Sequence, residues 1–258
     1  MNFEIVRGDA SSPYVVHVPH SSTRIPEDVR ARLLLDDDAL AEELRRMTDA
    51  RTDELAILAA EQVAPRPWVF VNRLSRLVVD PERLPNEHEE MYDVGMGAVY
   101  TRTSGGMALR DADERAERAL LKRFLAPYAE SLTDLVDERL SATGHAVLID
   151  LHSYPVKALP YERHQDAKRP PVCLGVDFDH TPAALVERVS RACSAIGQVV
   201  VNEPFAGSYV PLRHFGRDNR VTSVMVELRR DMYLRHDGSL DPEGARRISD
   251  ALVAILGG

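Results

Sequence analysis

The stretch Ala146-Val147-Leu148-Ile149-Asp150, which leads through Leu151 to His152, decides the fold class. A short apolar run of this kind, bounded by turn-forming or charged residues, is typical of a buried β-strand. Four further runs rich in β-branched residues have the same character. They occupy residues Tyr14–Val18, Trp68–Val71, Val199–Val201 and Val221–Glu227.

Helical patterns separate these predicted strands. Apolar residues recur at helical spacing and are preceded or followed by capping residues, prolines and glycines in the positions typical of helix ends. The segments concerned are Pro26–Leu35, Asp36–Glu61, Ala108–Thr143 with a kink or division at Pro127, Thr181–Ile196 and Asp241–Gly257. The alternation predicts one α/β domain over residues 1–258, with a mixed, mostly parallel central sheet flanked by helices.

The composition and net charge of the chain exclude several classes of protein. The chain has 258 residues, of which 44% are hydrophobic and 28% charged, so it can bury a large core without disulfides or a structural metal. Its net charge is −9 and no basic tract occurs, which argues against nucleic-acid binding. Cys173 and Cys193 form no disulfide or metal-binding pattern. Without a signal peptide or a membrane-length apolar run, we expect a cytoplasmic protein that binds no membrane.

Two histidines come at the ends of predicted strands. His20 follows the first run, and His152 follows the run quoted above, where Asp150 could orient it. Ligands of α/β proteins gather beyond the carboxyl ends of the strands, and a catalytic zinc usually takes three His, Asp or Glu ligands. Asp49 and Asp53, four residues apart on one face of a predicted helix, offer the carboxylate; Asp49 is preferred and Asp53 is the alternative. The competing interpretation is that both histidines are core residues and both aspartates make surface ion pairs.

A glutamate and a group of arginines also follow strands. Glu227 ends an apolar run, where an ionised carboxylate needs a partner or a function, and it is positioned to act as a general base. Guanidinium groups bind carboxylates through paired hydrogen bonds, so the arginines indicate a small anionic substrate, although they could equally make ion pairs with acidic helices. The candidate residues for substrate binding are Asn72, Arg73, Arg76, Arg83, Tyr209 and Arg229.

Six motifs in order resemble the N-formylglutamate amidohydrolase family, from near the N-terminus to about Tyr233. They are VPHSS at 18–22, TDARTD at 48–53, NRLSRLVVDPER at 72–83, LIDLHSYP at 148–155, GSYVPLRHFGR at 207–217 and VELRRDMY at 226–233. The resemblance implies a phosphorylase/hydrolase-like fold similar to that of zinc carboxypeptidases and aspartoacylases, with one catalytic zinc. By position, His20, Asp49 and His152 would bind the zinc and Glu227 would be the general base.

The same resemblance makes Arg213 and His214 candidates for stabilising the oxyanion. The sequence departs from the family at Ser22, where glycine is common, at Glu82, where asparagine is common, and in the loop from Tyr154 to Lys168. The loop bears on which acyl group or side chain is preferred.

The expected reaction is therefore metal-dependent hydrolysis of the amide bond of N-formyl-L-glutamate or a related N-acyl amino acid. Two other zinc amidohydrolases are the alternatives, an N-acyl amino acid deacylase and a small-peptide carboxypeptidase. A non-catalytic protein that binds an acidic metabolite is a third alternative. The expected ligand is a small anionic N-acyl amino acid, and the expected assembly is a monomer or a small homo-oligomer.

Overall fold

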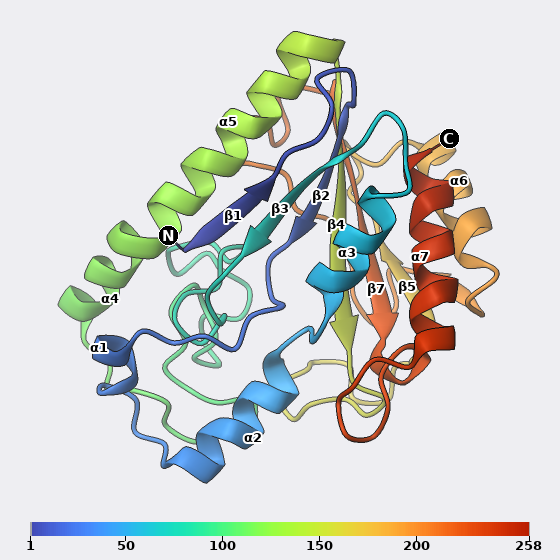
Figure 1. Ribbon diagram of the computed structural model, residues 1–258. Coiled ribbons are helices and arrows are strands. Elements are labelled where there is room, and N and C mark those ends of the chain that lie inside the picture. Colours follow the sequence, from blue (N-terminus) through green and yellow to red (C-terminus); the bar gives the residue numbers. More distant parts are fainter. Residues whose placement is uncertain (1, 258) are drawn as a thin grey trace.

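A single seven-stranded sheet organises the molecule (Figure 1). The structure is a computed structural model and describes residues 2–257. The strand order is β1-β3-β2-β4-β7-β5-β6. The strands are β1 (Phe3–Val6), β2 (Tyr14–Val18), β3 (Trp68–Asn72), β4 (Ala146–Tyr154), β5 (Val172–Gly175), β6 (Val199–Val201) and β7 (Val221–Arg229).

The four central strands run in one direction. β3, β2, β4 and β7 pair in parallel, whereas β1 is antiparallel to β3 and β5 is antiparallel to β7. The outermost strand, β6, is parallel to β5. This arrangement confirms the predicted α/β class with a mixed, mostly parallel sheet. It also brings the carboxyl ends of four strands to one edge, which is where ligands gather in such sheets.

The two longest strands carry the central part of that edge. β4 and β7 pair over nine positions, from Ala146 opposite Val221 to Tyr154 opposite Arg229. The predicted strand ended at Asp150, but the pairing with β7 continues it for four more residues. His152 therefore lies within β4 and faces Glu227 across the ladder, rather than in the loop beyond the strand.

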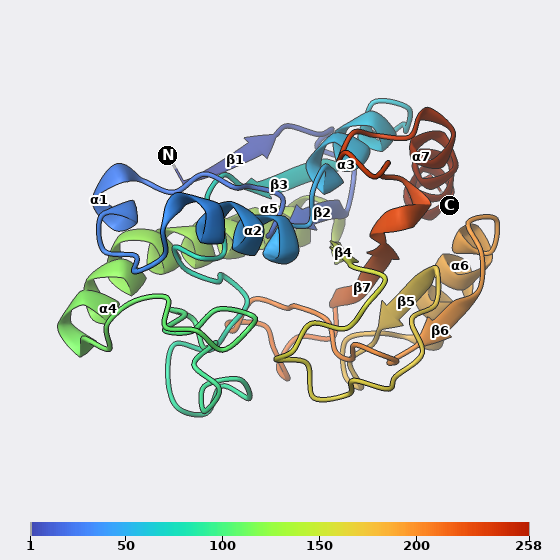
Figure 2. The same ribbon diagram turned by 90° about the horizontal axis from the view of Figure 1, so that it is seen from below.

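Helices cover both faces of the sheet (Figures 1 and 2). On one face, α3 (Thr52–Ala60), α6 (Ala183–Cys193) and α7 (Pro242–Leu256) pack on the apolar side chains of the central strands. On the other face lies α5 (Ala126–Thr143), whose Tyr128, Leu132 and Leu135 pack on Val15 and Phe70. The remaining helices are α1 (Glu27–Arg30), α2 (Asp37–Met47) and α4 (Glu114–Leu120), with short turns η1 (Leu121–Leu125) and η2 (Arg230–Met232).

Two predicted helices are divided in the structure. The helix expected over 36–61 is interrupted between Met47 and Thr52, because Thr48 is extended and Arg51 has a left-handed φ of 68°. The helix expected over 108–143 begins only at Glu114 and contains the π-helical turn η1 just before Pro127. No helix in residues 2–257 combines the length and apolar character needed to cross a bilayer.

Candidate metal centre and active site

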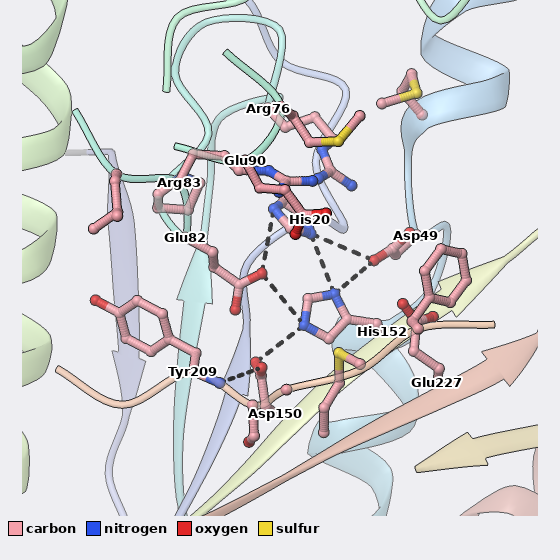
Figure 3. Close-up of a pocket in the computed structure, with 18 of the residues that line it drawn as sticks. His20, Asp49, Arg76, Glu82, Arg83, Glu90, Asp150, His152, Tyr209 and Glu227 are labelled. Atoms are coloured by element: carbon pink, nitrogen blue, oxygen red, sulfur yellow. Dashed lines mark hydrogen bonds and ion pairs between the residues drawn. The ribbon is translucent and has the colours of Figure 1, made fainter. Parts of the chain in front are cut away.

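Three of the sequence-predicted residues converge at the carboxyl edge of the sheet (Figure 3). The Nδ1 atoms of His20 and His152 are 3.2 Å apart. Oδ2 of Asp49 is 3.2 Å from Nδ1 of His152 and 3.6 Å from Nδ1 of His20. All three side chains are buried. In a tetrahedral site with ligands about 2.0 Å from zinc, neighbouring ligands lie about 3.3 Å apart. The three atoms therefore have the spacing of a zinc site with one position left open.

Each of the three residues comes from a different segment. His20 lies two residues beyond β2, His152 lies within β4, and Asp49 lies in the link between α2 and α3. The backbone N–H of Asp49 donates to the carbonyl of His20 at 2.9 Å. Arg230, which follows β7, donates to Oδ1 of Asp49 at 3.2 Å and leaves Oδ2 directed at the histidines.

Asp53, the alternative carboxylate, lies elsewhere. It accepts a 2.6 Å hydrogen bond from Arg73, which also contacts Glu4 on β1. The expectation that Asp49 and Asp53 share a helix face is wrong, because the helix is interrupted at Arg51. The structure thus brings Asp49, and not Asp53, to the two histidines.

The outer nitrogen of each histidine faces another carboxylate. Nε2 of His20 is 3.0 Å from Oδ1 of Asp80, and Nε2 of His152 is 3.1 Å from Oδ1 of Asp150. Asp80 is itself held by Arg76, at 2.6 Å, and by the hydroxyl of Tyr100. Metal-binding histidines commonly have such carboxylate partners, which fix the ring and make the inner nitrogen a better ligand.

The electrostatics of the group favour a cation between the imidazoles. Burial opposes ionisation of Asp49, but hydrogen bonds from His152 and His20 outweigh it and hold the pKa of Asp49 below its ordinary value. Burial also favours neutral His152, yet the charges of Glu82 and Asp150 and a hydrogen bond to Asp49 raise its pKa well above the ordinary value. The group therefore attracts positive charge to the point where the two Nδ1 atoms meet, and the donor set fits a metal ion.

Glu227, on β7, lies beside the three candidate metal ligands. It faces His152 in the β4–β7 ladder, and its Oε2 is buried without a hydrogen-bond partner among residues 2–257. Burial raises the pKa of Glu227 to about 8, against the opposing effect of nearby His152. A buried, unpartnered carboxyl with a pKa near neutrality is suited to transferring protons.

A cavity of about 1120 Å³ opens onto this group. Of the other predicted site residues, Arg76, Arg83, Tyr209 and Arg213 line it. Both Arg76 and Arg83 contact carboxylates, namely Asp80 and Glu89.

Four predicted site residues have partners away from the cavity. Arg73 is paired with Glu4 and Asp53, and Arg229 with Asp231 and the carbonyl of Arg169. Asn72 donates to the carbonyl of Pro19, so it supports the segment that carries His20. The ring of His214 is buried 2.9 Å from Asp137 of α5. The structure does not bring these four side chains to the candidate metal ligands.

Three residues that line the cavity or contact the candidate metal ligands had no predicted role. Asp80 and Glu82 follow the Asn72–Arg76 motif, and Oε2 of Glu82 is 3.4 Å from Nε2 of His152. Arg230 lies three residues after Glu227, and the sequence does not distinguish it from Arg229. The position of Glu227 at the end of an apolar run is the signal that identifies it, whereas nothing in the sequence distinguishes Asp80 from an ordinary ion-pair partner.

Comparisons with known proteins identify the family and the fold. The family model for N-formylglutamate amidohydrolase matches residues 12–234. A crystal structure of N-formylglutamate amidohydrolase from Ralstonia eutropha aligns with a TM-score of 0.79 and 23% identity, covering 98% of this chain and 95% of that one. A gene product from Agrobacterium tumefaciens aligns with a TM-score of 0.72 and 19% identity, covering 99% and 93%. Both likenesses show the fold.

No curated protein sequence matches the chain. The family model, however, spans all six motifs, from Val18–Ser22 to Val226–Tyr233, and it covers most of the chain. The chain therefore belongs to the N-formylglutamate amidohydrolase family.

Proposed function

We propose that the protein is a zinc-dependent amidohydrolase that cleaves the amide bond of N-formyl-L-glutamate or a closely related N-acyl amino acid. The observation that carries the proposal is the convergence of His20, Asp49 and His152 beside Glu227, within one cavity of a chain of this family. The two imidazoles and the carboxylate are ligands typical of catalytic zinc.

His20, Asp49 and His152 would hold the metal ion. When bound, zinc acts as a Lewis acid on the amide carbonyl and makes water a stronger nucleophile at neutral pH. Asp80 and Asp150 would keep the two imidazole rings in the orientation in which Nδ1 faces inward. Arg230 would keep Oδ2 of Asp49 directed at the same point.

Glu227 would move the proton. In hydrolysis a C–O bond forms between water and the acyl carbon, the C–N bond breaks, and one proton passes from water to the leaving nitrogen. Glu227 has a free Oε2 to accept that proton and then to donate it to the nitrogen. Proton transfer of this kind contributes roughly 10²- to 10⁴-fold to the rate.

Arg76 and Arg83 would hold the carboxylates of the amino acid. They line the cavity on the side where Asp80 supports His20. Arg213 lines the cavity as well, but its partner, at 2.6 Å, is Asp137 of α5, whereas Arg76 and Arg83 adjoin the candidate metal ligands through Asp80. Arg76 and Arg83 are therefore our first candidates for recognising an anionic substrate.

Two variants test the proposal together. Glu227→Gln should keep bound zinc and lose at least 100-fold in kcat for N-formyl-L-glutamate, because only the proton acceptor is removed. His152→Ala should lose both zinc and turnover. Zinc content is measured by elemental analysis and turnover by release of formate. Wild-type kcat in Glu227→Gln would remove Glu227 as the base, and full zinc content in His152→Ala would remove the metal assignment.

A further inference from the structure

The cavity is larger than N-formyl-L-glutamate requires. At the volume of about 30 Å³ that a water molecule occupies in the liquid, the roughly twelve non-hydrogen atoms of that compound fill about 360 Å³. The cavity measures about 1120 Å³. Space for a considerably larger molecule therefore adjoins the candidate metal ligands.

Part of the surplus space borders one face of a helix. Leu121 and Leu125 of the π-helical turn η1 line the cavity, and so do Ala126, Ala129 and Thr133 of α5. Leu121, Leu125, Ala129 and Thr133 follow one another at intervals of four residues, which places them in a row along the helix, and Ala126 adjoins this row. At 1.5 Å per residue, the row from Leu121 to Thr133 extends for about 18 Å. π-Helical turns such as η1 are frequent at functional sites.

The segment 204–215 also lines the cavity, through Val210 and Leu212, and Val210 shares a buried apolar cluster with Val136 of α5. Asp137 of α5 holds this segment by contacts with Arg213 at 2.6 Å and His214 at 2.9 Å. At its other end, the backbone N–H of Tyr209 donates to Oδ2 of Asp150 at 3.3 Å. The segment 204–215 is thus fixed to α5 at one end and, through Tyr209, to Asp150 beside His152 at the other; Figure 3 shows the second contact.

One part of the cavity lining is mostly apolar. We call the part formed by Leu121, Leu125, Ala126, Ala129, Val210 and Leu212 the apolar arm; Lys122, Glu130 and Arg213 also line the cavity along this stretch. The side chain of Leu212 is 61% exposed, so the protein itself leaves it uncovered. The guanidinium groups of Arg76, Arg83 and Arg230 instead contact Asp80 and Asp49 near the candidate metal ligands. Exposed apolar surface inside a cleft is typical of a ligand-binding site.

We propose that the apolar arm binds the acyl chain of an N-acyl amino acid, and that the protein prefers acyl groups of several carbons over formyl. This inference rests on the proposed amide hydrolysis. The amino acid portion carries the carboxylates, which belong beside the arginines. We place the acyl portion, on the other side of the scissile bond, in the apolar arm.

A series of substrates tests the acyl assignment. The zinc-loaded protein is assayed with N-formyl-, N-acetyl-, N-hexanoyl- and N-octanoyl-L-glutamate. Burial of each added methylene should raise kcat/KM by up to about fourfold, the equivalent of 0.8 kcal/mol. If the protein hydrolyses the formyl and acetyl compounds but kcat/KM falls as the acyl chain lengthens, the acyl assignment is overturned and the proposed function is left intact. No hydrolysis of any member would overturn both.

A matched pair of variants locates the effect. Ala129→Trp fills the apolar arm and should lower the ratio of kcat/KM for the octanoyl and formyl substrates at least tenfold. Ala142→Trp makes the same change at an exposed position on α5 and should leave the ratio unchanged. An unchanged ratio in Ala129→Trp, with its fold verified by circular dichroism, would contradict the proposal. If the protein instead prefers N-formyl amino acids with apolar side chains over N-formyl-L-glutamate and does not prefer longer acyl groups, the arm binds the amino acid side chain. This result would also contradict the acyl assignment.

Discussion

At the scale of single residues, we propose that Asp80 supports His20 as a zinc ligand. Its Oδ1 faces Nε2 of His20 at 3.0 Å, while its Oδ2 is held by Arg76. Asp80→Asn should weaken zinc binding by 10- to 100-fold, as is usual when the carboxylate partner of a ligating histidine is lost. Zinc dissociation constants measured by competition with a chromogenic chelator check this. Asp53→Asn, a matched change away from the site, should leave zinc affinity unaltered; equal affinities in all three proteins would show that Asp80 does not support the metal.

At the scale of elements, the interruption between α2 and α3 places Asp49. Arg51 closes the interruption with φ of 68°, a conformation that costs most residues roughly 1–2 kcal/mol and β-branched residues more. Arg51→Val should therefore lower the free energy of unfolding by about 1 kcal/mol or more. Arg51→Gly should retain wild-type stability, because relief of strain offsets the loss of the exposed Arg51–Glu54 pair. Urea denaturation compares them, and equal stability of the valine and glycine variants would argue against strain at this position.

The same interruption shows what the sequence could and could not reveal. Apolar runs and strand-end residues predicted the α/β class, the central strands and the positions of His20 and Glu227. Apolar residues at helical spacing flank Thr48–Arg51 on both sides, up to Met47 and again from Leu55, and no proline or glycine lies between them, so the break was not predicted. Tertiary contacts stabilise it: Asp49 bonds to the His20 carbonyl, and the Tyr233 hydroxyl donates to the carbonyl of Ala50 at 2.8 Å. The half-exposed edge strand β1 and the four-residue β5 lack a run of β-branched residues like that of the shorter β6: Glu4 interrupts β1, and Val172 is the only β-branched residue of β5. They were missed for this reason.

At the scale of the whole molecule, the candidate metal ligands connect separate parts of the fold. The ends of β2 and β4 and the α2–α3 link meet there, so a ligand bound to all three should stabilise the folded state. Zinc at 100 times its dissociation constant adds about 2.7 kcal/mol. For a domain of this size the melting temperature should rise by roughly 5–10 °C. Thermal unfolding with zinc and with chelator measures the shift.

A pair of histidine variants controls that measurement. His152→Ala should abolish the zinc-dependent rise, because it removes a candidate ligand. His145→Ala changes an exposed histidine seven residues earlier and should preserve the rise. Equal rises in the two variants would place zinc binding at another site.

The most direct test of metal-dependent hydrolysis is formate release from N-formyl-L-glutamate by one preparation of the protein. The assay compares untreated protein, protein stripped with chelator, and stripped protein to which zinc is returned. Our account predicts loss of turnover on stripping and recovery with zinc in the wild type, and no recovery in Glu227→Gln. Turnover that persists at the same rate after complete removal of metal would contradict it.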